Sequence, residues 1–84
     1  MLDVVILSAQ DFLFQGRARQ VIFPGEEGVF EVCPLHRPLV SRLLPGFIMV
    51  DDRAIPILRG VVKVHHDVVT AIVEPEPIKR DDVP

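Results

Sequence analysis

Tryptophan and tyrosine are absent from this 84-residue sequence, and cysteine occurs once, at Cys33. One cysteine cannot form an internal disulfide, so nothing indicates an oxidising compartment. Without tryptophan or tyrosine, few side chains could stack on nucleic-acid bases. The nine lysines and arginines are scattered along the chain, and the formal net charge is −3. The sequence therefore predicts no nucleic-acid partner, because such partners require a basic patch.

Long hydrophobic runs are also missing. The longest uninterrupted apolar stretches, such as residues 4–7 and 47–50, hold about four residues, whereas a membrane-spanning helix needs about 20. The N-terminus carries Asp3 and lacks the basic start of a signal peptide. These features predict a small, acidic, soluble and cytoplasmic domain.

Short runs of valine and isoleucine between turn-forming residues dominate what is present. Eight prolines punctuate the chain, and their spacing between Pro24 and Pro56 leaves no room for a long helix. Such a pattern is typical of an all-β sandwich or barrel. We expect one domain over residues 1–74 and a mobile, proline-rich polar tail over residues 75–84.

The runs predict short strands that pair as antiparallel hairpins. Residues 2–7 are nearly all apolar, which favours a strand covered on both faces. A loop is expected over residues 24–28, and a hairpin around Asp51 and Asp52. The predicted strands are 2–7, 12–15, 17–23, 29–33, 38–44, 47–50, 54–58, 61–65 and 68–73.

Two groups of residues raise the question of catalysis or metal binding. Cys33 and His36 stand three positions apart and could form a nucleophile and its base. Such pairs are usually assembled by the fold, however, and a lone cysteine among apolar residues is more often a small core residue. His65 and His66 would point to opposite faces of a strand, so we interpret them as flanking a surface turn. One cysteine and three histidines do not make a zinc pattern.

The segment Gly25-Glu26-Glu27-Gly28 resembles a phosphate-binding loop only in its two glycines. Phosphate loops open a helix and usually have a basic side chain nearby, whereas this one carries two carboxylates and leads into a predicted strand. An exposed acidic loop tip is the simpler interpretation. The residues thus predict a non-enzymatic β module that works by contact, with no cofactor and no metal.

The stretch from Phe23 to Leu39 adds a resemblance to this interpretation. It reads FPGEEGVFEVCPLHRPL and resembles the signature of the ATP synthase epsilon subunit, which is broadly Leu-Pro-Gly, two residues, Gly, an apolar strand, and Leu-Pro-Gly-His-Ala-Pro-Leu. Further similar segments follow the family's order from about Val4 to Val73. They are 14–16, 44–46, 59–64 and 67–73.

The sequence also departs from the family pattern. Glu31 and Leu35 stand where the family commonly has glycine, Arg37 replaces a small residue, and Arg59 replaces the first glycine of a pair. The usual epsilon subunit continues into a C-terminal pair of helices, whereas this chain stops in a ten-residue tail. It is therefore expected to be either a naturally short form or an isolated N-terminal domain.

The resemblance implies a flattened antiparallel β-sandwich of two sheets. It also implies a non-catalytic rotor subunit of the central stalk, which couples the gamma shaft to the membrane c ring during proton- or sodium-driven ATP synthesis. Its place would be peripheral, on the cytoplasmic face of the inner (plasma) membrane. A free-standing β-sandwich adaptor for another protein is the alternative. ATP binding by this chain is not expected, because a Gly-rich, basic phosphate site is missing from its sequence.

Two sets of contact positions come with this resemblance. Matching positions imply gamma-subunit binding by Ser8, His36, Leu39, Val40 and Ser41. They imply c-ring binding by Glu26, Glu27, Val29, Phe30 and Glu31.

Overall fold

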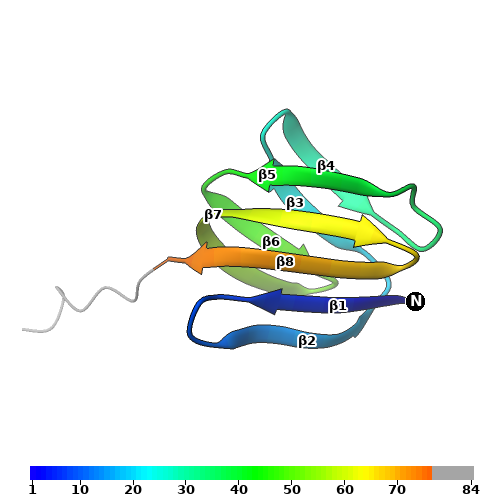
Figure 1. The fold of residues 1–84 in the computed structure, drawn as a ribbon, viewed down its shortest axis with the longest axis horizontal. Coiled ribbons are helices and arrows are strands. Elements are labelled where there is room, and N and C mark those ends of the chain that lie inside the picture. The colour runs from blue at the N-terminus through cyan, green and yellow to red at the C-terminus, as the bar shows by residue number, and fades with distance from the viewer. Residues whose placement is uncertain (77–84) are drawn as a thin grey trace, which may run out of the picture.

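The computed structural model describes residues 1–76 and consists of eight strands joined by short turns (Figure 1). No helix is present among these residues. The strands are β1 (Leu2–Leu7), β2 (Phe12–Ala18), β3 (Val21–Gly25), β4 (Gly28–Val32), β5 (Leu39–Leu43), β6 (Gly46–Val50), β7 (Arg53–His65) and β8 (Val68–Pro75).

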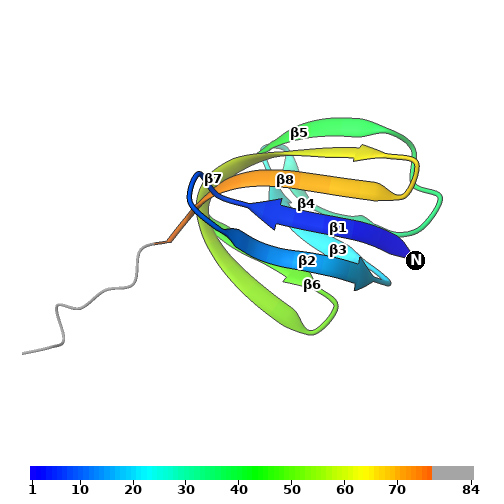
Figure 2. The ribbon, with the colours of Figure 1, turned by 60° about the horizontal axis from the view of Figure 1, so that its bottom comes forward.

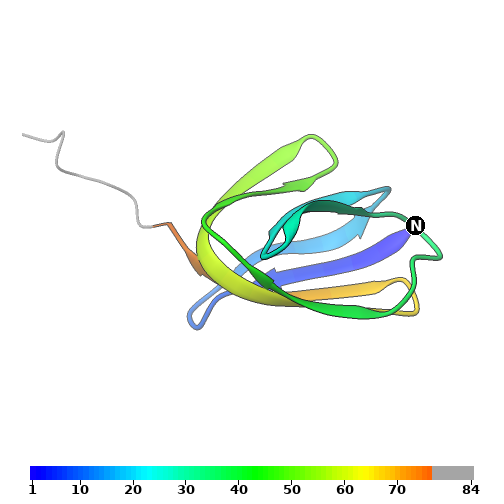
Figure 3. The ribbon, with the colours of Figure 1, turned by 90° about the horizontal axis from the view of Figure 1, so that it is seen from above.

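The strands form two layers that share β7. Strands β2, β1, β8, the second half of β7, and β5 lie side by side in one layer (Figure 2). Strands β4, β3 and β6 make the other layer, and the first half of β7 pairs with β6 there. Figure 3 shows β7 curving from one layer into the other. The predicted all-β sandwich is therefore confirmed.

Alternation of apolar and polar residues explains how the core forms. In the second half of β7, Val62 and Val64 are buried, whereas Lys63 and His65 are exposed. A strand directs successive side chains to opposite faces, so every second residue enters the space between the layers. The buried core comprises Leu2, Val4, Ile6, Ala18, Val21, Phe23, Val32, Leu43, Ile48, Val50, Ile55, Ile57, Val62, Val64, Val69, Ala71 and Val73.

Strand β1 differs from the sequence prediction in two ways. Its pairing with β8 is parallel, with Val4 opposite Val69, so the sandwich is not purely antiparallel. Its side chains are also not covered on both faces: Val4 and Ile6 are buried, but Asp3 is exposed and Val5 is half-buried. The outer face of β1 carries the exposed Asp3 and the half-buried Val5 and Leu7.

The single strand predicted over residues 17–23 is wrong. Arg17 and Ala18 end β2, the chain turns at Arg19 and Gln20, and β3 begins at Val21. The carboxylate of Asp51 lies in the β6–β7 turn, and its Oδ1 accepts the backbone N–H groups of Arg19 and Gln20, each at 3.1 Å. A side chain 31 residues away fixes this turn, and the local sequence does not show it.

Two other boundaries also move. Pro24 and Gly25 belong to β3, so the loop predicted over residues 24–28 shrinks to a two-residue turn at Glu26 and Glu27. The strands predicted over 54–58 and 61–65 are one continuous strand, β7. The hairpin around Asp51 and Asp52 is as predicted.

Gly60 lies where the two predicted strands merge, and it permits close pairing of β7 with β8. A Cβ placed there would lie 2.7 Å from the backbone oxygen of Ile72 and 2.7 Å from a methyl group of Val73. Only glycine fits such an approach without displacing the backbone.

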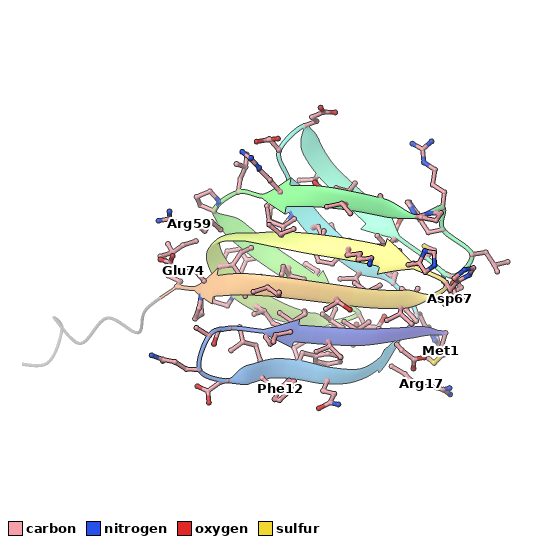
Figure 4. All side chains as sticks on the ribbon, in the orientation of Figure 1. Met1, Phe12, Arg17, Arg59, Asp67 and Glu74 are labelled. Carbon is pink, nitrogen blue, oxygen red and sulfur yellow. The ribbon has the colours of Figure 1, made fainter. Side chains whose placement is uncertain are left out.

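Ion pairs lie at both ends of the sandwich, where Figure 4 labels Arg17 at one end and Arg59 with Glu74 at the other. Arg17 Nε is 3.3 Å from Asp3 Oδ1, and Arg59 Nε is 3.3 Å from Glu74 Oε1. All four side chains are exposed, so each pair contributes little to stability.

Beyond β8, the backbone N–H of Glu76 donates to the Pro56 carbonyl oxygen at 3.3 Å. Pro75 belongs to β8, so the last strand continues one residue past the predicted start of the tail. Residues 77–84, most of that predicted tail, lie outside the described residues.

Residues 1–76 contain no helix that is long and apolar enough to cross a membrane.

Candidate subunit-binding surface

A shallow, open hollow of about 620 Å³ lies between the β3–β4 hairpin and β5. Its walls come from the hairpin tip, the start of β4, the segment after the Cys33–His36 turn, and β5. They consist of Gly25, Glu26, Glu27, Gly28, Val29, Phe30, His36, Arg37, Leu39, Val40, Ser41 and Arg42.

The hollow exists because two strands there have free edges. Strand β4 ends its layer, and within the described residues only β3 pairs with it. Strand β5 pairs along its length with β7, but its other edge meets β3 only where Leu43 faces Gly25. Exposed strand edges present unpaired backbone groups and are natural sites for contact with another chain.

Exposed apolar side chains accompany these edges. Val29 on β4 is 75% exposed and Val40 on β5 is 70% exposed. Phe30 and Leu39 are only half-buried and pack against the core, and the Phe30 ring stacks on Phe23 with 5.5 Å between centroids. The hollow therefore has an apolar floor attached to the core, flanked by two valines that pack against little of this chain.

Charges of both signs stand around the hollow. Arg42 Nη1 lies 4.0 Å from Glu26 Oε2, and both side chains are exposed. The Glu26 backbone N–H also donates to the Arg42 carbonyl oxygen at 3.1 Å, which fastens the hairpin tip to β5. Ser41 Oγ donates to the same carbonyl at 2.9 Å. A surface of this composition, apolar at its centre and charged at its rim, suits contact with a protein partner.

The structure brings together most residues of the two predicted contact sets. Eight of the ten line the hollow: His36, Leu39, Val40 and Ser41 from the first set, and Glu26, Glu27, Val29 and Phe30 from the second. Glu31 follows Phe30 on β4, is exposed, and lies outside the lining.

Ser8 lies apart from the rest. It follows β1, and β8 and β7 separate β1 from β5 in the sheet. The Ser8 hydroxyl accepts the backbone N–H groups of Gln10 and Asp11 at 3.2 and 3.1 Å. Its visible role is to close the turn between β1 and β2.

Sequence reasoning assigned no contact role to Arg37 and Arg42, which also line the hollow. Arg42 was visible only as a charge within an apolar run. The pairing of β5 places Arg42 opposite Val61 on the outer face and beside the hairpin tip, and that placement depends on the fold.

The interpretation of Cys33 as a core residue is wrong, because Cys33 is exposed. Strand β4 ends at the buried Val32, and Cys33 begins the turn that follows. His36 donates its backbone N–H to the Cys33 carbonyl at 3.1 Å, while its ring Nδ1 lies 2.8 Å from the Arg37 carbonyl oxygen. No hydrogen bond joins the Cys33 thiol to the His36 ring within residues 1–76, so the geometry offers no nucleophile–base pair.

His65 and His66 do lie at a turn, as predicted, but they do not point to opposite faces. Their rings are 4.0 Å apart in an edge-to-face arrangement. His66 has a φ of 50°, so it has left the strand and the alternation of faces no longer applies. In the part of the chain that the structure describes, no three His, Cys, Asp or Glu side chains gather as a metal site.

A family model and individual relatives indicate the same protein family for this chain. Residues 1–75 match the family described as "ATP synthase, Delta/Epsilon chain, beta-sandwich domain". The chain is 40% identical over 78 residues to an ATP synthase epsilon chain from Nitratiruptor sp., covering 87% of this chain and 60% of that protein. It is 39% identical over 64 residues to ATP synthase epsilon chain 2 from Ralstonia nicotianae, covering 71% and 46%. The chain thus spans about half of each curated relative.

Solved structures share the fold. A chain of the central stalk/c-ring structure of the Tetrahymena thermophila mitochondrial ATP synthase matches with a TM-score of 0.72 and 12% identity, covering 99% of this chain and 77% of the other. A chain of the Euglena gracilis mitochondrial ATP synthase matches with a TM-score of 0.78 and 20% identity, covering 96% and 57%.

Proposed function

Because the chain belongs to the ATP synthase delta/epsilon family of β-sandwich domains, we propose that it is a non-catalytic subunit of the central stalk of an F-type ATP synthase. In this role it joins the gamma shaft to the membrane c ring, so that rotation of one is transmitted to the other. It is peripheral to the membrane, on the cytoplasmic face, and is held there through the complex.

The observation that carries the proposal is the open edge of the sandwich. Eight of the ten residues implied as contacts surround one hollow between β4 and β5. Free strand edges, exposed valines and charges of both signs occur together there. A rigid body with one adhesive edge can transmit force between two partners without moving parts of its own.

The geometry also refines how the two partners would be arranged. The proposed shaft contacts on β5 and the proposed ring contacts on the β3–β4 hairpin border the same hollow, so the two partners approach neighbouring walls of it. The acidic pair Glu26 and Glu27 stands at the hairpin tip, where it can face basic or polar loops of the ring.

Substitution at the hollow tests the shaft contact. Ser41→Glu puts a charge where the proposed interface excludes water, and it should weaken binding to the gamma subunit by about 2 kcal/mol or more. Isothermal titration of the chain into a gamma-containing head complex that lacks it measures this loss. Thr70→Glu is the matched control, because Thr70 lies in β8 of the same layer, outside the hollow and opposite Lys63.

Equal affinities for the wild type and the Ser41 variant, with the fold intact, would contradict the proposed contact. Failure of the wild type itself to bind the head complex would contradict the rotor function and favour an adaptor for another protein.

A further inference from the structure

The turn between β4 and β5 has an unusual residue at its most constrained position. The His36 N–H donates to the Cys33 carbonyl oxygen at 3.1 Å, which closes a four-residue turn. Pro34 occupies the second position, and Leu35 occupies the third with a φ of 68°. This is a type II turn, whose third position favours glycine or asparagine because φ is positive. A leucine there is strained.

Packing of the Leu35 side chain against the domain does not compensate for this backbone strain. It is 92% exposed, more than any other large hydrophobic residue of the described chain. Its backbone is nevertheless held firmly, since its N–H donates to Asp67 Oδ1 at 2.7 Å. The Asp67 carbonyl oxygen accepts the Asp3 N–H at 2.8 Å, so the turn is fastened to the ends of β1 and β8. Leu35 is therefore a fixed apolar projection, in place before any partner arrives.

This projection stands beside the proposed contact surface. A second hollow is lined by Leu35, His36, Arg37, Pro38, His66 and Asp67. His36 and Arg37 also line the hollow between β4 and β5, so the two hollows form one continuous surface. Leu35 lies on the side that leads into β5, away from the acidic hairpin tip.

We propose that Leu35 is an apolar anchor that inserts into a pocket of the gamma shaft. The inference rests on the proposed function and adds a specific residue to it. The pocket should be apolar at its base and acidic at its rim, because Arg37 lines the same hollow as the projection while the Asp67 carboxylate already accepts the Leu35 N–H. A preorganised hydrophobic side chain that fills a partner's pocket is typical of the few residues that dominate binding.

Substitution of Leu35 separates anchoring from a purely structural role. Leu35→Asn removes the apolar side chain and supplies a residue that tolerates the left-handed conformation. We expect its binding to a gamma-containing head complex, measured by isothermal titration, to be about tenfold weaker or more, with a melting temperature no lower than that of the wild type. Leu35→Ala also removes the apolar side chain but keeps a residue that is strained at positive φ. Its binding to the head complex should likewise be about tenfold weaker or more. Phe47→Asn, at an exposed apolar position outside both hollows, should bind like the wild type.

The possible failures are distinguishable. If the wild type binds and the Asn and Ala variants bind equally well, Leu35 is not an anchor and the rotor proposal stands. If the melting temperature of the Asn variant falls and its binding does not change, Leu35 acts within the domain only. If the wild type does not bind the head complex, both proposals are wrong.

Discussion

The sandwich has a closed side and an open side, and the two are built differently. On the closed side, β1, β8 and the second half of β7 pair on both edges, and alternate residues such as Ile6, Val69 and Val62 are buried. On the open side, β4 and β5 each leave an edge free, and Val29 and Val40 face solvent. Apolar composition is similar in both, so composition alone does not say which side is core.

The difference teaches where stability and binding reside in a domain of this size. A small domain buries a modest fraction of its surface, so its folding free energy depends on the residues buried between the two layers, which include Val32 of β4 and Leu43 of β5. The domain tolerates the exposure of apolar residues on the open side, and under the proposed function these residues contact a partner. Substitutions on the two sides should therefore have effects on different measurements.

The largest contrast in stability should come from truncating one apolar residue on each side. Ile6→Ala removes fully buried atoms and should lower the free energy of unfolding by about 2–5 kcal/mol. Val40→Ala removes exposed atoms and should change it by less than about 0.5 kcal/mol. Urea unfolding of both variants gives the comparison, and a Val40→Ala cost as large as that of Ile6→Ala would show that the open side is part of the core.

Two glycines test how tightly the strands of the closed side pair. Gly60→Ala would place a methyl group against the Ile72 backbone oxygen, so β7 and β8 must separate and we expect a loss of about 1–3 kcal/mol. Gly16→Ala is the control, because its nearest neighbour is the Phe14 ring at an ordinary 3.5 Å. Thermal unfolding should show a clear drop for the first variant and little change for the second. An unchanged melting temperature for Gly60→Ala would mean that the pairing there is looser than the structure shows.

The closed side was the more predictable of the two from sequence. Alternation in Val61–His65 predicts a half-buried strand correctly, because the two faces of such a strand differ in polarity. The apolar run Leu2–Leu7 also predicts a strand, although only one of its faces is buried. The turn at Arg19 and Gln20 was missed because its stabilising partner is Asp51, far along the chain. A local hydropathy pattern does not predict a hydrogen bond to a residue that is distant in the sequence.

The contact residues proposed for the open side come from the family resemblance and not from a local sequence pattern. The residues of the hollow come largely from the β3–β4 hairpin and from β5. Their spacing in the sequence does not predict that these two segments lie side by side. Cys33 looked like a core residue because its neighbours are apolar, yet β4 ends one residue earlier and leaves it outside. Leu35 gave no signal by hydropathy, since only its positive φ and its exposure distinguish it.

Asp67 connects the two sides, and its removal should have an intermediate effect. Asp67→Ala deletes the acceptor for the Leu35 N–H and puts alanine at a φ of 61°, so we expect a loss of about 1–3 kcal/mol. Asp67→Asn keeps a carbonyl acceptor and a residue that tolerates this conformation, and it should lose less. Chemical denaturation measures both, and hydrogen exchange at the Leu35 amide should accelerate in the alanine variant. An Asp67→Ala variant as stable as the wild type would show that the hydrogen bond contributes nothing.

The smallest expected effect belongs to Cys33, at the beginning of the open side's turn. Its side chain is exposed, so Cys33→Ser exchanges one solvated group for another of similar size and should change the free energy of unfolding by less than about 0.5 kcal/mol. Val32→Ala, one residue earlier and fully buried, is the matched control and should cost several times more. In the native protein, a maleimide reagent should label Cys33 completely without prior unfolding. Labelling that requires denaturant would place Cys33 inside the core and move the boundary between the closed and open sides past the end of β4.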